Sequence, residues 1–163
     1  ETVHQLIRNT GFAGHEKTLP SWLDEGLATL FEVVRGGRWA GVGRVNDQRI
    51  TDWRSQKPEP RLAPLLRDEG FGRGYDRDLY ARCWALAYFL VTKHPDKTTL
   101  FFDAIRDTKP VPRHLESSRV VRDFAKSVGE IPATEAEWHE FLRGIKAPLE
   151  EFDPNRKSTR DRR

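Results

Sequence analysis

The sequence DRDLYARCWALAYFLVTK, residues 76–93, carries the clearest helical pattern of the chain and decides its fold class. Apolar residues recur in it at the three- and four-residue spacing of one helix face. That face consists of Leu79, Cys83, Leu86, Ala87 and Leu90, and Trp84 and Phe89 widen it. We therefore expect a long helix at about 76–93 with a wide buried face.

Helical periodicity continues through most of the chain. It predicts further helices at about residues 1–9, 22–35, 47–55, 62–67, 96–107, 117–128 and 134–146. Residues 38–45, RWAGVGRV, are the stretch whose composition suits a strand or a short hairpin. The predicted fold is therefore mainly α, with at most a short β-hairpin.

Several residues mark the expected ends of these helices. Ser21 is the expected N-cap of the second helix, and the pair Gly36-Gly37 is expected to stop that helix. Asn46 is the expected N-cap of the third helix. His94, directly before a proline, is the expected C-terminal cap of the long helix.

Length and composition indicate one domain with a charged surface. The chain has 163 residues, of which 37% are apolar and 33% charged, and its net charge is +3. We expect a domain over residues 1–152 and a basic, disordered tail over residues 153–163. The single cysteine, Cys83, excludes an internal disulfide framework and a cysteine-rich zinc site. No apolar run approaches the length of about 18 residues that spans a bilayer, so no membrane segment is expected.

The basic tail raises the question of nucleic-acid binding. Residues 156–163 hold five basic residues and one acidic residue, whereas basic and acidic residues alternate elsewhere. Short basic runs are more often solvated termini than binding sites. We therefore expect no clear nucleic-acid partner, although steep salt-dependent binding lost on deletion of the tail would show one.

The start of the chain contains part of a zinc-binding pattern. In the helical motif H-E-x-x-H, two histidines one turn apart bind zinc, and the glutamate beside the first activates water. Glu1 and His4 match the glutamate and the second histidine of that motif. The first histidine is expected directly before Glu1, upstream of this sequence. A catalytic zinc site needs a third protein ligand, and Glu25 lies near the start of the next predicted helix, after a loop long enough to reverse direction.

Three segments together resemble the gluzincin metallopeptidases. They are residues 1–4 (ETVH), residues 22–28 (WLDEGLA) and residues 80–86 (YARCWAL). The second segment matches the W-L-x-E-G-x-A pattern of the helix that carries the third zinc ligand in that superfamily. Within it, ETVHQ followed by NTG at residues 9–11 is most similar to the bacterial DUF1570 family. The resemblance implies the helical, C-terminal subdomain of a zincin-like fold, beginning inside the motif.

The resemblance also implies a role for each matched residue. Glu1 would be the general base, while His4 and Glu25 would be zinc ligands. Tyr80 would donate a hydrogen bond to the oxyanion of the tetrahedral intermediate, and Tyr75 is the second candidate for this role. The substrate would be a peptide or protein. The isolated chain, without the upstream histidine, is expected to be inactive.

Each of these residues also has a purely structural explanation. E-x-x-H occurs often in helices, and a glutamate near a helix N-terminus is favoured by the helix dipole. A tyrosine at the position of Tyr80, on a helix with Trp84, is more often a core residue than a catalytic one, and His15 is only a remote candidate for a metal ligand. The alternative function is therefore a non-catalytic binding module that keeps a peptidase-like helical scaffold.

Overall fold

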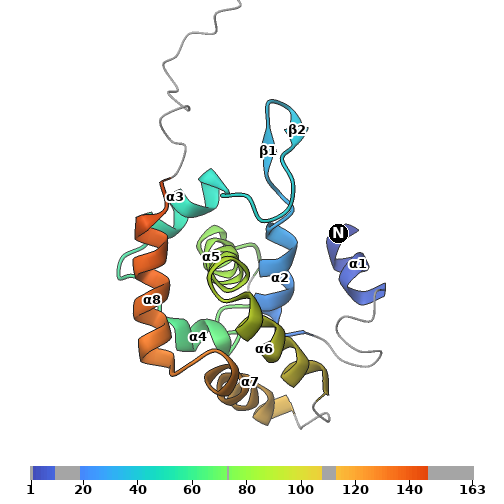
Figure 1. Ribbon diagram of the computed structural model, residues 1–163, viewed down its shortest axis with the longest axis vertical. Helices are drawn as coiled ribbons and strands as arrows, with labels where there is room; N and C mark the ends of the chain where they lie inside the picture. Colours follow the sequence, from blue (N-terminus) through green and yellow to red (C-terminus); the bar gives the residue numbers. More distant parts are fainter. Residues whose placement is uncertain (1, 10–18, 73, 108–112, 147–163) are drawn as a thin grey trace, which may run out of the picture.

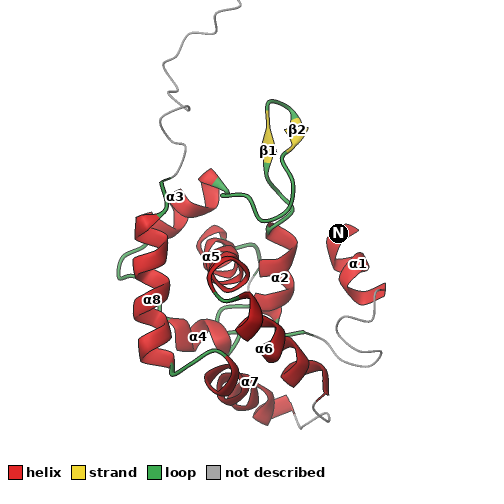
Figure 2. Cartoon of the chain, in the orientation of Figure 1, coloured by secondary structure: helices red, strands yellow, loops and turns green. Residues whose placement is uncertain are grey.

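Helix α5 (Arg77–Lys93) runs through the centre of the structure, and other helices surround it (Figure 1). The computed structural model describes residues 2–9, 19–72, 74–107 and 113–146. The remaining helices are α1 (Thr2–Asn9), α2 (Ser21–Thr29), α3 (Asp47–Ser55), α4 (Leu62–Leu66), α6 (Pro95–Asp107), α7 (Arg113–Ser127) and α8 (Ile131–Gly144). Strands β1 (Val34–Arg35) and β2 (Arg38–Trp39) form an antiparallel hairpin that projects from the helices (Figure 2). The expected mainly α fold with a short hairpin is confirmed.

The long helix ends where the sequence predicts. Asp76 is its N-cap, and its carboxylate accepts hydrogen bonds from the backbone N–H groups of Asp78 and Leu79. His94 is its C-cap residue, and its N–H donates to the carbonyl of Leu90. Because α5 contacts α2, α3, α6 and α8, most of its side chains are buried on several sides.

Aromatic side chains anchor the start of α2 to α6 and α7. Trp22 is fully buried and stacks on Phe101 of α6 with ring centroids 6.1 Å apart. Its ring also meets Phe124 of α7 edge-on at 6.5 Å. Such aromatic pairs contribute about 0.5–1.5 kcal/mol beyond the area that they bury. The start of α2, three residues before Glu25, is therefore held in place by α6 and α7.

The hairpin corrects two expectations about the segment after α2. The helix ends at Thr29, and the backbone hydrogen bonds that follow reach back only three residues. The Thr29 hydroxyl donates to the Gly26 carbonyl at 2.7 Å. Gly36 and Gly37, expected to stop the helix, instead form the hairpin turn with φ values of +57° and +76°. A two-residue hairpin turn with positive φ at both positions strongly favours glycine. The hairpin thus occupies residues 34–39 rather than the expected 38–45.

The cap of α2 also differs from the expectation. Ser21 is the first residue of the helix rather than its N-cap, and Pro20 occupies the cap position without a side-chain hydrogen bond. The Asp68 carboxylate supplies the cap, accepting from the N–H groups of Ser21 at 2.8 Å and Trp22 at 2.9 Å. Burial raises the pKa of Asp68, although these hydrogen bonds oppose the rise.

We predict that Asp68→Asn lowers the free energy of unfolding by about 1–2 kcal/mol, because an amide offers one acceptor oxygen where two are used. Asn tolerates the positive φ of +57° at this position, so the loss reports the hydrogen bonds rather than backbone strain. Urea unfolding followed by circular dichroism measures this change in the free energy of unfolding. The neighbouring exposed carboxylate of Glu69 serves as the control, and equal losses for Asp68→Asn and Glu69→Gln would refute the prediction.

None of the helices in the described part of the chain is long and apolar enough to cross a membrane.

Candidate metal centre

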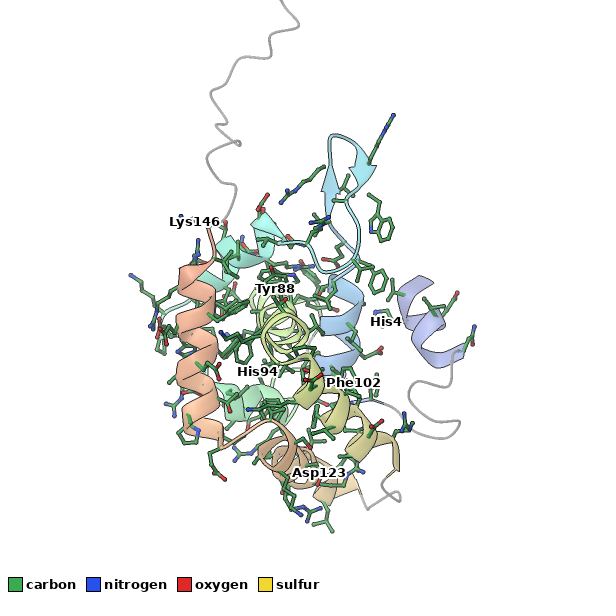
Figure 3. The ribbon with its side chains drawn as sticks, viewed as in Figure 1. His4, Tyr88, His94, Phe102, Asp123 and Lys146 are labelled. Carbon is green, nitrogen blue, oxygen red and sulfur yellow. The ribbon has the colours of Figure 1, made fainter. Side chains whose placement is uncertain are left out.

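Helices α1, α2 and α5 bring three of the four predicted site residues together. His4 lies on the side of α1 that faces α2 (Figure 3). Its Nε2 atom is 3.6 Å from Oε2 of Glu25 on α2. Tyr80, near the start of α5, lies beside the same Glu25 carboxylate, whose charge adds to burial in raising the pKa of the Tyr80 hydroxyl. Residues distant in the sequence therefore converge on one carboxylate.

The separation of His4 and Glu25 suits two ligands of one zinc ion. Zinc binds histidine nitrogen at about 2.0–2.1 Å and carboxylate oxygen at about 2.0–2.2 Å, so two tetrahedral ligands lie roughly 3.4 Å apart. The observed 3.6 Å is close to that value and longer than a good hydrogen bond. The His4 and Glu25 side chains are 18% and 25% exposed, which leaves the pair accessible from solvent.

Asp24 is a member of the site that motif matching did not single out. Its Oδ1 lies 3.1 Å from Nδ1 of His4, the ring nitrogen that does not face Glu25. The contact lacks hydrogen-bond geometry, since Nδ1 is buried without a hydrogen-bond partner among the described residues. Metal-binding histidines commonly present their second nitrogen to a carboxylate, which fixes the ring orientation. The signal in the sequence is the position of Asp24 directly before Glu25.

Gly26 is the residue that lets α2 approach α5 closely. A Cβ atom built at Gly26 would lie 2.7 Å from the carbonyl oxygen of Cys83 and 2.9 Å from Cβ of Ala87, both on α5. The glycine that follows Glu25 in the W-L-x-E-G-x-A pattern therefore has a packing role. It allows the Glu25 carboxylate to lie against the start of α5.

The surroundings of Glu25 keep two nearby side chains protonated. Burial raises the pKa of Tyr80, and the charge of Glu25 raises it further. Burial also raises the pKa of the Cys83 thiol, with the Glu25 charge as the next cause. Tyr80 is thus a hydrogen-bond donor at neutral pH, and the fully buried Cys83 is a packing residue rather than a thiolate ligand.

Arg49 of α3 connects the two tyrosines to the rest of the domain. Its guanidinium lies 5.6 Å from the centroid of the Tyr80 ring and hydrogen-bonds both oxygens of Glu32. The Tyr75 and Tyr80 rings are 5.0 Å apart. Burial alone would lower the pKa of Arg49, but hydrogen bonds to Glu32 and Tyr75 raise it, so the cation persists at all physiological pH values. Sequence reasoning missed Arg49, because no motif marks it.

Two predicted residues lie outside this geometry. Glu1, the expected general base, and His15, the remote candidate ligand, fall outside the described residues. Among the residues that the structure does describe, no cluster of three or more histidine, cysteine, aspartate or glutamate side chains could hold a metal ion. A catalytic zinc site needs three protein ligands, and His4 and Glu25 are two candidates for them within the described residues.

Comparison with known proteins identifies the family. The model of the family DUF1570, whose description is "protein of unknown function", matches residues 1–112, and the chain belongs to this family. The match includes α1, α2 and the start of α5, which carry His4, Glu25 and Tyr80. No curated protein and no solved structure matches the chain.

Proposed function

We propose that the full-length protein containing this chain is a zinc-dependent metallopeptidase of the gluzincin type. The observation that carries the proposal is the approach of His4 Nε2 to Glu25 Oε2 at 3.6 Å, with Tyr80 beside the same carboxylate. The proposal requires a histidine directly before Glu1 as the remaining zinc ligand. His4 and Glu25 would hold zinc together with that histidine, and Asp24 would orient the His4 ring.

Each residue then has a defined chemical task. Bound zinc supplies Lewis acidity that polarises the scissile carbonyl and lowers the pKa of water toward about 7. Glu1 accepts the proton of the attacking water and returns it to the leaving amine. Tyr80 donates its hydroxyl proton in a hydrogen bond to the oxyanion that develops on the carbonyl oxygen. Its raised pKa suits this task, because the hydroxyl stays protonated at neutral pH.

Replacement of the zinc ligand on α2 tests the proposal. The full-length protein should contain about one equivalent of zinc, and Glu25→Gln should lose the metal and the hydrolysis of peptides together. Metal content is measured by atomic absorption after dialysis against a weak chelator. Glu69→Gln, which changes an exposed carboxylate of a loop, is the control and should keep both. A zinc-free wild-type protein would favour the alternative, a non-catalytic binding module.

We predict that Tyr80→Phe lowers kcat about 10²-fold while KM and zinc content change little, because the lost donor acts on charge that develops in the transition state. Steady-state kinetics of the full-length protein measure the effect. Tyr88→Phe is a matched control on the same helix, since Tyr88 stacks on Trp84 with ring centroids 5.1 Å apart, and should leave kcat unchanged. Equal kcat values for the two variants would exclude Tyr80 as the oxyanion donor.

A further inference from the structure

An open cavity of about 460 Å³ lies between the base of the hairpin, α3 and the segment that leads into α5. Its lining includes Val33, Val34, Asp47, Asp52, Tyr75 and Arg77. The cavity adjoins the candidate metal centre through Tyr75, whose ring packs against that of Tyr80. The Tyr75 ring would therefore separate a group bound in the cavity from Tyr80, the proposed oxyanion donor.

Two carboxylates of the cavity have unused acceptor atoms. Asp52 is 3% exposed, and its Oδ1 accepts a hydrogen bond from the Gln48 side chain at 2.9 Å. Its Oδ2 is buried and has no hydrogen-bond partner within the part of the chain that the structure describes, and the same holds for Oδ1 of Asp47. A buried carboxylate oxygen without a donor is costly, typically by 1–3 kcal/mol or more. A hydrogen-bond donor would stabilise these oxygens, and a cationic donor would do so most strongly.

The cations already present satisfy this need only in part. Arg49 is taken up by Glu32, whose two carboxylate oxygens it hydrogen-bonds. The Arg77 Nε atom lies 3.6 Å from Oδ1 of Asp52, beyond hydrogen-bond distance, and its side chain is 61% exposed. An exposed ion pair at this distance is weak, so the Arg77 side chain can move into solvent. A cationic group of a ligand can then replace it beside Asp52.

We propose that this cavity binds the lysine or arginine side chain of a peptide, with Asp52 and Asp47 as partners of its cationic group. Of the two valines in the lining, Val34 is the exposed one, and its side chain offers an apolar surface against which the aliphatic stem of such a side chain packs. The identification of the peptide as a substrate rests on the proposed peptidase function. In that setting the cavity selects a basic residue close to the scissile bond.

Binding of small probes to the full-length protein tests the proposal without requiring zinc or hydrolysis. The probes are Nα-acetyl-lysine methylamide and its norleucine counterpart, which has a similar stem and no charge. Titration followed by nuclear magnetic resonance should give saturable shifts at the amides of Val33 and Asp47. The lysine probe should bind at least tenfold more tightly, as expected from a charge-assisted hydrogen bond.

Three variants distinguish a binding role from a structural one. Asp52→Asn should lower the affinity for the lysine probe about tenfold or more. Asp47→Asn should also lower this affinity, and it tests the same carboxylate pair at a less buried position. Arg77→Ala should tighten binding severalfold, because it removes the competing cation. Asp96→Asn is the matched control, because Asp96 lies in the first turn of α6 as Asp47 lies in the first turn of α3. It should leave the affinity for the lysine probe unchanged.

Equal affinity for both probes, or weaker binding of the lysine probe by Arg77→Ala, would overturn the proposal. If the full-length protein contains zinc but does not prefer the lysine probe, the cavity assignment is contradicted. If the full-length protein contains no zinc, the peptidase assignment is contradicted.

Discussion

Replacement of Gly26 by alanine is expected to destabilise the domain by about 3 kcal/mol. The added Cβ would meet the Cys83 carbonyl oxygen at 2.7 Å and the Ala87 Cβ at 2.9 Å, and both atoms belong to the central helix α5. Neither can move without separating α2 from α5. Alanine favours a helix over glycine by about 1 kcal/mol, so the steric cost exceeds the gain in helix propensity.

Urea unfolding compares Gly26→Ala with Gly144→Ala, a matched change at the end of α8. A Cβ at Gly144 would meet nothing within 4 Å, so this control should be neutral or slightly stabilising. Separation of the helices would also move Glu25 away from Tyr80, and the zinc affinity of the full-length variant should fall with its stability. Equal stabilities of the two variants would show that α2 does not depend on glycine for its approach to α5.

Replacement of Glu1 by glutamine is expected to lower peptide hydrolysis by the full-length protein about 10³-fold while zinc remains bound. The amide cannot accept the proton of the attacking water, whereas His4 and Glu25 are left unchanged. Paired measurements of kcat/KM and zinc content test this. Gln5→Glu, at the residue after His4, controls for a change of charge close to the zinc ligand and should keep activity within a few-fold. Loss of zinc in Glu1→Gln would mean that Glu1 supports the metal instead of acting as a base.

The sequence predicted those features that depend on local pattern. The spacing of Leu79, Cys83, Leu86 and Leu90 placed α5 within one residue of its observed start, and Asn46 caps α3 as expected. Helices α7 and α8 begin a few residues earlier than their periodicity indicated. Of the candidate site, His4, Glu25 and Tyr80 lie near one another, and the roles assigned to them stay predictions.

The features that sequence reasoning missed depend on contacts between distant segments. Asp68 caps α2 although it lies 47 residues after Ser21 in the sequence. The residues around Ser21 therefore contain no sign that another residue is the cap. The Gly36-Gly37 pair suits both a helix stop and a hairpin turn, and the early end of α2 at Thr29 decides between them. Arg49 reaches Tyr80 only because α3 packs across α5, which no local pattern reveals.

The central claim is that His4 and Glu25 share a zinc ion in the full-length protein. Crystals of that protein, measured on both sides of the zinc absorption edge, test it most directly. We predict an anomalous peak about 2.0–2.2 Å from His4 Nε2 and from a Glu25 carboxylate oxygen, with a histidine before Glu1 as a further ligand. The absence of a peak between these two side chains, or zinc bound elsewhere in the protein, would contradict the account.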